Sequence, residues 1–267
     1  MRRDQLFWGV ILLLVGGLML ANEMGIKLPN GMSLMELFWP AVLIFGGIWV
    51  LVGVFFRRSG SVEVEDVSID LQGAASADLK VSHGAGELKL HGGANANEFA
   101  HGSFTGGLEH KATRNGDRLE VRMRPAKDMF DFAFFGPRSQ LDWDVALNAE
   151  VPIALKLNLG ANKSDLDLHD MNITDLDLDT GASDTKLTLP ARGRFRADLD
   201  LGAASLEVIV PEGLSARIRA SLGAVDLKID QSRFPHNGRY YQSPDYETAA
   251  NAVDMTIDAG AASIQVK

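Results

Sequence analysis

Residues 155–190 read LKLNLGANKSDLDLHDMNITDLDLDTGASDTKLTLP and contain two copies of one pattern. In each copy a Gly-Ala dipeptide, at Gly160 and again at Gly181, stands between stretches of alternating apolar and polar residues. Two further dipeptides, at Gly202 and Gly223, continue the series with the same spacing of 21 residues. A fixed period of this length indicates a fold built from similar coils that stack on one another.

The apolar positions change phase at each Gly-Ala dipeptide. Before Gly160 they stand at odd offsets, as at Leu155 and Leu157, and after it at even offsets, as at Leu166. An unbroken strand cannot make this change, because its side chains alternate between two faces with period two. We therefore expect a corner at every dipeptide, where glycine reaches positive φ and alanine lets successive coils approach closely.

Two outlying copies of the pattern extend the series towards both ends of the chain. With them, the expected corners are Gly84, Gly160, Gly181, Gly202, Gly223 and Gly260. The region 59–267 is thus predicted to be a single all-β domain, a β-solenoid with 21-residue repeats and room for eight or nine turns. An antiparallel meander or sandwich is the alternative, but the equal spacings argue against it because meander loops vary in length.

The first 58 residues form a separate region that is predicted to be a transmembrane hairpin. Two uncharged stretches support helical spans at about 6–22 and 36–56, and the second alone is long enough to cross a bilayer. A cleaved signal peptide competes for the first span. No small-residue cleavage site follows it, however, and a second span follows closely, so the hairpin is favoured.

Basic residues predict the orientation of this hairpin. Arginine pairs flank it, at positions 2–3 and 57–58, whereas the connecting loop holds only Lys27 beside Glu23. Because Lys and Arg concentrate on the cytoplasmic side, both termini and the solenoid domain are predicted to be cytoplasmic. The absence of cysteine fits either side of the membrane.

Composition and motifs exclude several functions. The whole chain has a net charge of −9, and residues 59–267 alone carry 21 basic and 32 acidic residues, a balance of −11 that repels nucleic acid. Alternating acids, as at Asp175, Asp177 and Asp179, invite a calcium site, but they are also typical of the wet face of a strand. No catalytic residue, metal site or cofactor is predicted, although paired carboxylates on one face could in principle cleave a polysaccharide.

The histidines of the chain are also read as having no chemical role. They lack the short spacings of a zinc site and no cysteine accompanies them. We therefore expect all six at the surface: His83, His91, His101, His110, His169 and His236.

One apolar segment interrupts the repeat and is the candidate contact with a partner or a membrane. Its side chains are Met129, Phe130, Phe132, Phe134 and Phe135. An exposed apolar loop of this kind is an aggregation liability unless something covers it. Three roles remain open for it: capping the end of the solenoid, inserting at the membrane interface, or docking on a partner.

Two parts of the sequence resemble known protein families. The uncharged hairpin contains Phe38-Trp39-Pro40 and Gly46-Gly47 and ends in a pair of arginines. Behind it follow the motifs Leu141-Asp142-Trp143-Asp144-Val145, Val151-Pro152-Ile153, Leu159-Gly160-Ala161 and Leu187-Thr188-Leu189-Pro190. The hairpin is similar to the LiaI/LiaF-like transmembrane region of bacterial envelope-stress proteins, and the later motifs resemble the toast-rack domain of adhesin-like and LiaF-like proteins.

The resemblance implies a right-handed, single-stranded β-solenoid without catalytic residues. For LiaF-type members it further implies a regulator that restrains a membrane histidine kinase. This chain has two expected spans where that regulator has more, so no functional residue is carried over.

Two functional hypotheses follow from the residues and the resemblance together. The first is a non-catalytic, membrane-anchored sensory or regulatory protein whose solenoid surface binds a signalling partner. The second is a membrane-attached scaffold that polymerises through the open sheet edges at the solenoid ends. A carbohydrate-binding or polysaccharide-cleaving face is a third alternative if the domain lies outside the cell.

Overall fold

The computed structural model describes residues 64–126 and 141–267, and every regular element in these ranges is a β-strand. By the contacts among its residues the chain divides into two units, and the described residues all belong to one of them. The all-β prediction is therefore confirmed for this unit. Its strands are β1 (Val64–Asp70), β2 (Ser76–Gly92), β3 (Glu98–Thr105), β4 (Leu108–Asn115), β5 (Arg118–Pro125), β6 (Asp142–Leu147), β7 (Ile153–Asp167), β8 (Ile173–Thr180), β9 (Asp184–Thr188), β10 (Arg194–Ile209), β11 (Ser215–Ile229), β12 (Tyr241–Gln242) and β13 (Ala252–Val266).

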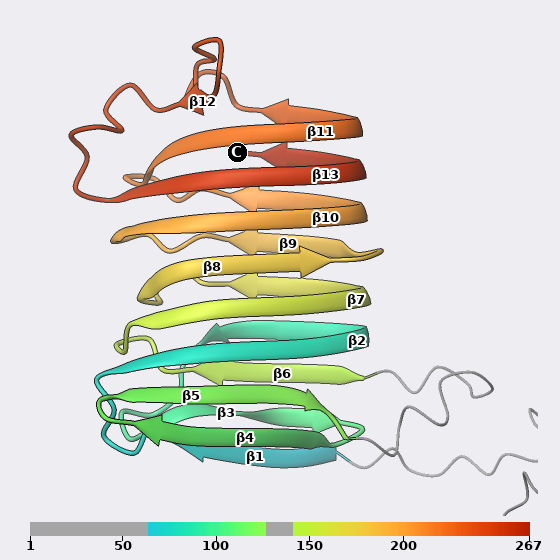
Figure 1. Cartoon of the computed structure of the whole chain (residues 1–267), viewed down its shortest axis with the longest axis vertical. Helices are drawn as coiled ribbons and strands as arrows, with labels where there is room; N and C mark the ends of the chain where they lie inside the picture. Colours follow the sequence, from blue (N-terminus) through green and yellow to red (C-terminus); the bar gives the residue numbers. More distant parts are fainter. Residues whose placement is uncertain (1–63, 127–140) are drawn as a thin grey trace, which may run out of the picture. The chain divides into compact units, whose positions relative to one another are not determined.

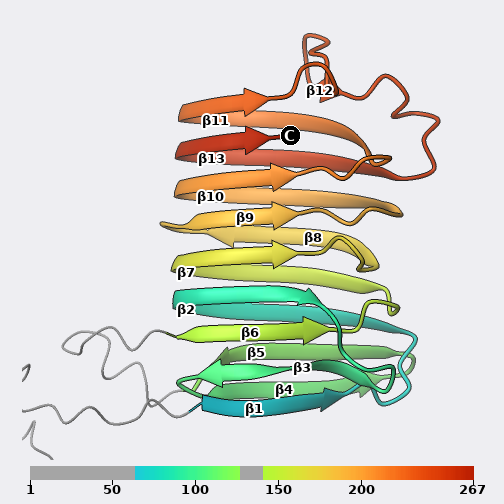
Figure 2. The same cartoon turned by 180° about the vertical axis from the view of Figure 1, so that it is seen from behind.

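The long strands bend in their middle and stack in parallel (Figures 1 and 2). β7 pairs with β8 so that Leu155 lies opposite Leu176, and β8 pairs with β10 so that Leu176 lies opposite Ala197. Residues one repeat apart therefore lie side by side. Each coil contributes one segment before its Gly-Ala bend and one after it, and we call the two resulting outer surfaces the pre-bend face and the post-bend face.

The order of coils in space differs from their order in the sequence. The C-terminal strand β13 lies between β10 and β11, so Ala261 faces Ala203 on one side and Ala224 on the other. Gly223 therefore does not follow Gly202 in the stack, although the sequence places it one repeat later. The equal spacing of the fourth dipeptide reflects the length of a coil, whereas its position is decided by which strand edges pair.

The N-terminal end of the unit departs from the regular solenoid. Here β1, β3 and β6 pair antiparallel, as do β4 and β5. Within the described ranges, parallel coils with both segments present are β5 with β6, β2, β7, β8 with β9, β10, β13 and β11, which is fewer than the eight or nine turns expected. The antiparallel strands β3 and β4, between β2 and β5, form a meander instead.

The bend glycines are required for space rather than for positive φ. A Cβ on Gly160 would lie 2.2 Å from the Gly84 carbonyl oxygen, and one on Gly202 would lie 2.8 Å from the Gly181 oxygen. None of the six bend glycines has positive φ, so the expectation that glycine is needed there for positive φ is wrong. The requirement is not equal at every bend, because a Cβ on Gly181 or Gly260 would lie 3.1 Å from its nearest atom and one on Gly84 would meet nothing within 4 Å.

The core is a set of aliphatic columns between the two faces. Leu176, Leu178 and Leu187 are fully buried, as alternation predicts. Burying such a side chain contributes about 1.5–3 kcal/mol, and each column repeats that contribution in every coil. At the N-terminal end the columns give way to aromatic packing, where the Phe104 and Trp143 rings meet edge to face at 5.1 Å.

Candidate interaction surface

The apolar segment of the sequence is inserted at a bend. β5 and β6 flank it and pair with the two segments of β2 on the same side, so together they form the coil next to β2. In β2, six residue steps lead from Val81 to Glu87, whereas 19 steps lead from Met123 to Asp142, their register partners. The insertion therefore adds 13 residues in place of a Gly-Ala bend. Residues 127–140 themselves, with all five predicted contact side chains, lie outside the described residues.

The chain enters the unit close to where it returns from this insertion. β1 begins at Val64, which pairs with Thr105 of β3. The neighbouring pair on β3 and β6 is Phe104 with Trp143, directly after Asp142. Val64 and Asp142 are thus separated by the width of two strand spacings, about 10 Å. The N-terminal region and the apolar insertion are consequently attached at one corner of the solenoid.

His83 fixes the point where the insertion ends. Its Nε2 lies 3.0 Å from the Leu141 carbonyl oxygen, which also accepts the Glu87 amide hydrogen at 3.1 Å. The ring packs against Trp143 at a centroid distance of 5.0 Å. His83 is only 1 % exposed, so its expected place at the surface is wrong. Alternation explains this, because position 83 points inward as Leu159 does one coil further on.

Burial sets the protonation state of this histidine. Desolvation lowers the pKa of His83, and the Leu141 carbonyl and nearby Asp142 offset this only in part. The neutral ring then donates from Nε2, while Nδ1 has no hydrogen-bond partner among the described residues. An acceptor nitrogen is therefore held in the core beside the base of the insertion.

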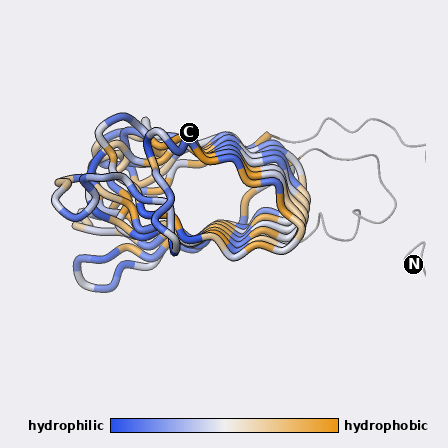
Figure 3. Tube along the Cα trace, turned by 90° about the horizontal axis from the view of Figure 1, so that it is seen from above, coloured by the Kyte–Doolittle hydropathy of each residue, from blue (hydrophilic) through white to orange (hydrophobic). Residues whose placement is uncertain are grey.

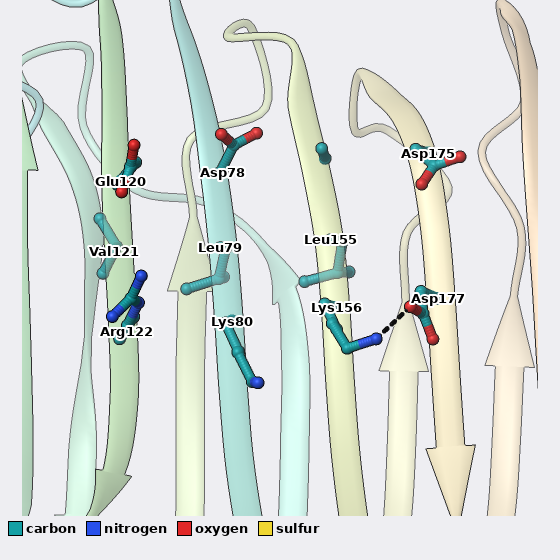
Figure 4. Close-up of a pocket in the computed structure, with 11 residues that line it drawn as sticks. Asp78, Leu79, Lys80, Glu120, Val121, Arg122, Leu155, Lys156, Asp175 and Asp177 are labelled. Atoms are coloured by element: carbon teal, nitrogen blue, oxygen red, sulfur yellow. Dashed lines mark hydrogen bonds and ion pairs between the residues drawn. The ribbon is translucent and has the colours of Figure 1, made fainter. Parts of the chain in front are cut away.

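The pre-bend face carries like charges in adjacent strands (Figure 4). Arg122, Lys80 and Lys156 face one another across β5, β2 and β7 and are followed by Asp177 of β8 and Asp198 of β10. Lys156 pairs with Asp177, whereas within the described ranges Lys80 and Arg122 make no ion pair. All of these residues except Asp198 border a shallow groove of about 330 Å³. Like charges directly opposite each other are unfavourable, so Lys80 and Arg122 repel each other within this row, although Asp78 and Glu120 line the same groove.

The next row on the same face is acidic. Asp179, Asp200 and Asp258 face one another across β8, β10 and β13. Desolvation raises the pKa of Asp200, and the carboxylates of Asp258 and Asp179 raise it further. The alternating acids that invited a calcium site are thus aligned in space. Nevertheless, no group of three or more potential metal ligands with suitable geometry occurs in the part of the chain that the structure describes.

One row of the post-bend face is arranged in the opposite way. Its charges alternate in sign from strand to strand, in the order Asp144, Lys89, Asp165, Lys186 and Glu207. Each member faces at least one opposite charge in an adjacent strand, which favours stacking of the coils. The contrast holds between these two rows, since Glu87 and Asp142 are like charges opposite each other elsewhere on the post-bend face.

Linear motifs could not have revealed this surface. The members of each charged row are distant in sequence, and only the strand register brings Arg122 beside Lys80. The sequence does contain one signal, the alternation of polar and apolar residues along each strand, and it correctly predicts that Lys80 and Lys156 point outward. Within residues 64–126 and 141–267, moreover, the structure has no helix of the length and hydropathy needed to cross a bilayer. Both expected spans fall outside those ranges.

These features define a repetitive β-structure with an exposed charged face, attached to an N-terminal region of different composition. The chain belongs to the toast-rack family, because the family model for the N-terminal domain of toast-rack matches residues 58–209. The model for the LiaI-LiaF-like transmembrane region matches residues 6–51, so the chain is membrane-associated. Both matches confirm the resemblance inferred from the sequence, in the same order along the chain.

Comparison with solved structures supports the fold. A candidate cell adhesion protein from Clostridium sporogenes ATCC 15579 aligns with a TM-score of 0.64 and 20% sequence identity, covering 77% of this chain and 98% of that one. A candidate adhesin from Bacteroides fragilis NCTC 9343 covers 78% of this chain and 98% of its own, with 6% identity and a TM-score of 0.29, too low to carry an argument. A comparison with curated proteins found no match.

Proposed function

We propose that this chain is a non-catalytic, membrane-anchored regulatory protein of the envelope-stress type, which binds a membrane signalling protein. The observation that carries the proposal is the shared corner of Val64 and Asp142. The N-terminal region contains the transmembrane match, and it joins the β unit at Val64.

The apolar insertion is the proposed contact. Four phenylalanines and one methionine within seven residues supply a large apolar area, and aromatic side chains are enriched where proteins bind one another. Inserting them at a bend leaves the strand pairing of β5 and β6 with β2 intact.

The pre-bend charges provide the second part of the proposed contact. Arg122 lies in β5, which precedes the insertion, and Lys80 lies opposite it in the neighbouring strand β2. A partner with acidic side chains opposite them would relieve their mutual repulsion, and such complementarity mainly sets specificity and the rate of association. A membrane histidine kinase is the proposed partner class, and both termini with the solenoid are proposed to be cytoplasmic.

The decisive test is site-specific photocrosslinking in the native membrane. A photoreactive amino acid replacing Phe132 is expected to crosslink to a sensor kinase, identified by mass spectrometry, whereas one replacing Lys186 on the post-bend face is the control and is expected to give no such product. Crosslinks from both positions, or from neither, would count against this contact.

Kinase activity supplies an independent measurement. Replacing residues 127–140 by a Gly-Ala bend is expected to raise autophosphorylation of the co-reconstituted kinase while the β-type circular dichroism stays unchanged. Unchanged kinase activity with a folded protein would reject the inhibitory role. A topology reporter fused after Lys267 tests the proposed sidedness, and an external reporter signal would overturn the cytoplasmic assignment.

A further inference from the structure

The stack ends at β11, and this end is covered only in part. β12 pairs with β11 at Arg217 and Ile218, where the Arg217 guanidinium lies over the rings of Tyr240 and Tyr246 at 5.2 and 4.2 Å. From residue 219 to residue 229, the outer edge of β11 has no strand partner among the described residues. Seen along the stack, the bends are not covered by this cap (Figure 3).

The inward side chains of this uncovered segment are also incompletely packed. Leu222 is 36% exposed, and Val225, Leu227 and Ile229 are half-buried. Their register partners one coil below include Ile264 and Val266, which are buried to 0% and 1% exposure. An edge strand with free backbone groups and an apolar inner side is a template for pairing with another strand.

The opposite end of the unit does not match this edge. β4 forms one outer strand there and carries exposed Lys111 and Arg114, and β1 forms the other with exposed Glu65 and Asp66. Charges of this kind protect an edge from pairing. Head-to-tail growth would therefore set an apolar edge against a charged one, so the polymer alternative is less favourable than pairing of like ends.

We propose that β11 of a second copy of this chain covers the edge, in an antiparallel pairing whose two-fold axis passes through Leu227. In that register Asp226 faces the partner's Lys228, and Val225 faces the partner's Ile229 on the inner side. Asp226 and Lys228 already form an ion pair within one chain, at 3.2 Å. The dimer brings two such pairs together as a square of alternating charges.

Charge selects this register over its neighbours. If the register between the two β11 strands shifts by one residue, the apolar residues of one strand lie opposite the polar residues of the other. Moving the axis to Asp226 sets that carboxylate against its own copy, and moving it to Lys228 sets two ammonium groups together. Like charges directly opposite are destabilising, so the axis at Leu227 is the favoured two-fold arrangement.

The absence of native cysteine allows a direct crosslinking test on the full-length chain in membranes. A chain carrying both Val225→Cys and Ile229→Cys, which keeps Asp226 and Lys228, is expected to form a disulfide-linked dimer on mild oxidation, because opposite residues of antiparallel strands are within disulfide reach. Ala204→Cys with Val208→Cys is the matched control, since these residues occupy the corresponding positions of β10 inside the stack. No dimer, or equal dimer from the control, overturns the proposal.

Charge exchange tests the register separately. A Leu227→Cys reporter on the axis is expected to crosslink to its own copy, to lose that product in Asp226→Lys chains and in Lys228→Asp chains, and to regain it when the two variants are co-expressed. Persistent crosslinking in either variant alone, or no recovery in the mixture, rejects the pairing. The inference is independent of the kinase proposal, because neither variant alters residues 127–140, Lys80 or Arg122.

Discussion

The Gly84 carbonyl oxygen lies 2.2 Å from the place that a Cβ on Gly160 would occupy. At Gly181 the corresponding distance, to the Gly160 oxygen, is 3.1 Å. Bends with the same Gly-Ala dipeptide therefore differ in the space that they leave for a Cβ atom. The tightest contact occurs where β2 meets β7, two coils that are adjacent in space but separated in sequence by β3 to β6.

This difference predicts unequal effects of alanine at two bends. Gly160→Ala is expected to destabilise the unit by about 1–3 kcal/mol, because its methyl group meets backbone that moves only with the coil. Gly181→Ala is expected to cost less. Urea unfolding of the full-length protein, followed by circular dichroism, checks the order, and equal midpoints would contradict the packing argument.

The leucine columns predict a second graded effect. Leu178→Ala is expected to cost about 2–5 kcal/mol, because the side chain is fully buried and the neighbouring coils cannot close the cavity. Leu222→Ala, at the uncovered end, is expected to cost clearly less. The same urea measurement compares them, and a loss at Leu222 as large as that at Leu178 would show that the end is covered in the protein as tested.

The acidic row predicts that removing a charge stabilises the protein. Because the pKa of Asp200 is raised in the folded state, ionisation disfavours folding, and the penalty develops as pH rises through the carboxylate range. Asp200→Asn is expected to gain about 0.5 kcal/mol at neutral pH, typical of one cross-strand pair, and nothing once the carboxyl is protonated. Asp184→Asn is the control, since Asp184 faces Lys163 and its loss is expected to destabilise.

Two histidines predict opposite pH dependences. The lowered pKa of His83 means that the folded state resists protonation, so stability falls as pH drops below the ordinary histidine pKa near 6.5. His83→Leu is expected to remove this acid sensitivity. The Leu141 carbonyl would still accept the Glu87 amide hydrogen.

His91 behaves in the reverse sense. Partial burial opposes its charge, but hydrogen bonds to the Gly92 carbonyl and to Asp144 raise its pKa overall. The contribution of His91 to the free energy of unfolding is complete below pH 6.5, the ordinary pKa of histidine. It is lost as the pH rises through the higher pKa of the folded state. His91→Gln is therefore expected to destabilise at pH 5.5 and to have little effect at pH 8. Parallel urea titrations at both pH values measure this, and a pH-independent loss would assign His91 a purely steric role.

Alternation and the Gly-Ala series predicted the all-β unit and most inward residues. Those predictions succeeded because strand periodicity and the lack of a glycine Cβ are properties of a short segment. The surface position expected for His83 is wrong because its place in the alternation, and not its residue type, decides that it points inward. The packing that favours glycine at the bends has no local signal, since the contacting atoms belong to another coil.

The sequence by itself determined the length of a coil, the position of its bend and the side of each strand that faces the core, because these follow from the local sterics of the backbone. Only the tertiary structure decided that β13 lies between β10 and β11, and that the apolar insertion returns beside Val64. It also decided which charged residues lie next to one another on the pre-bend face. All three depend on which strand edges pair, and pairing between distant segments is set by the free energy of the whole stack.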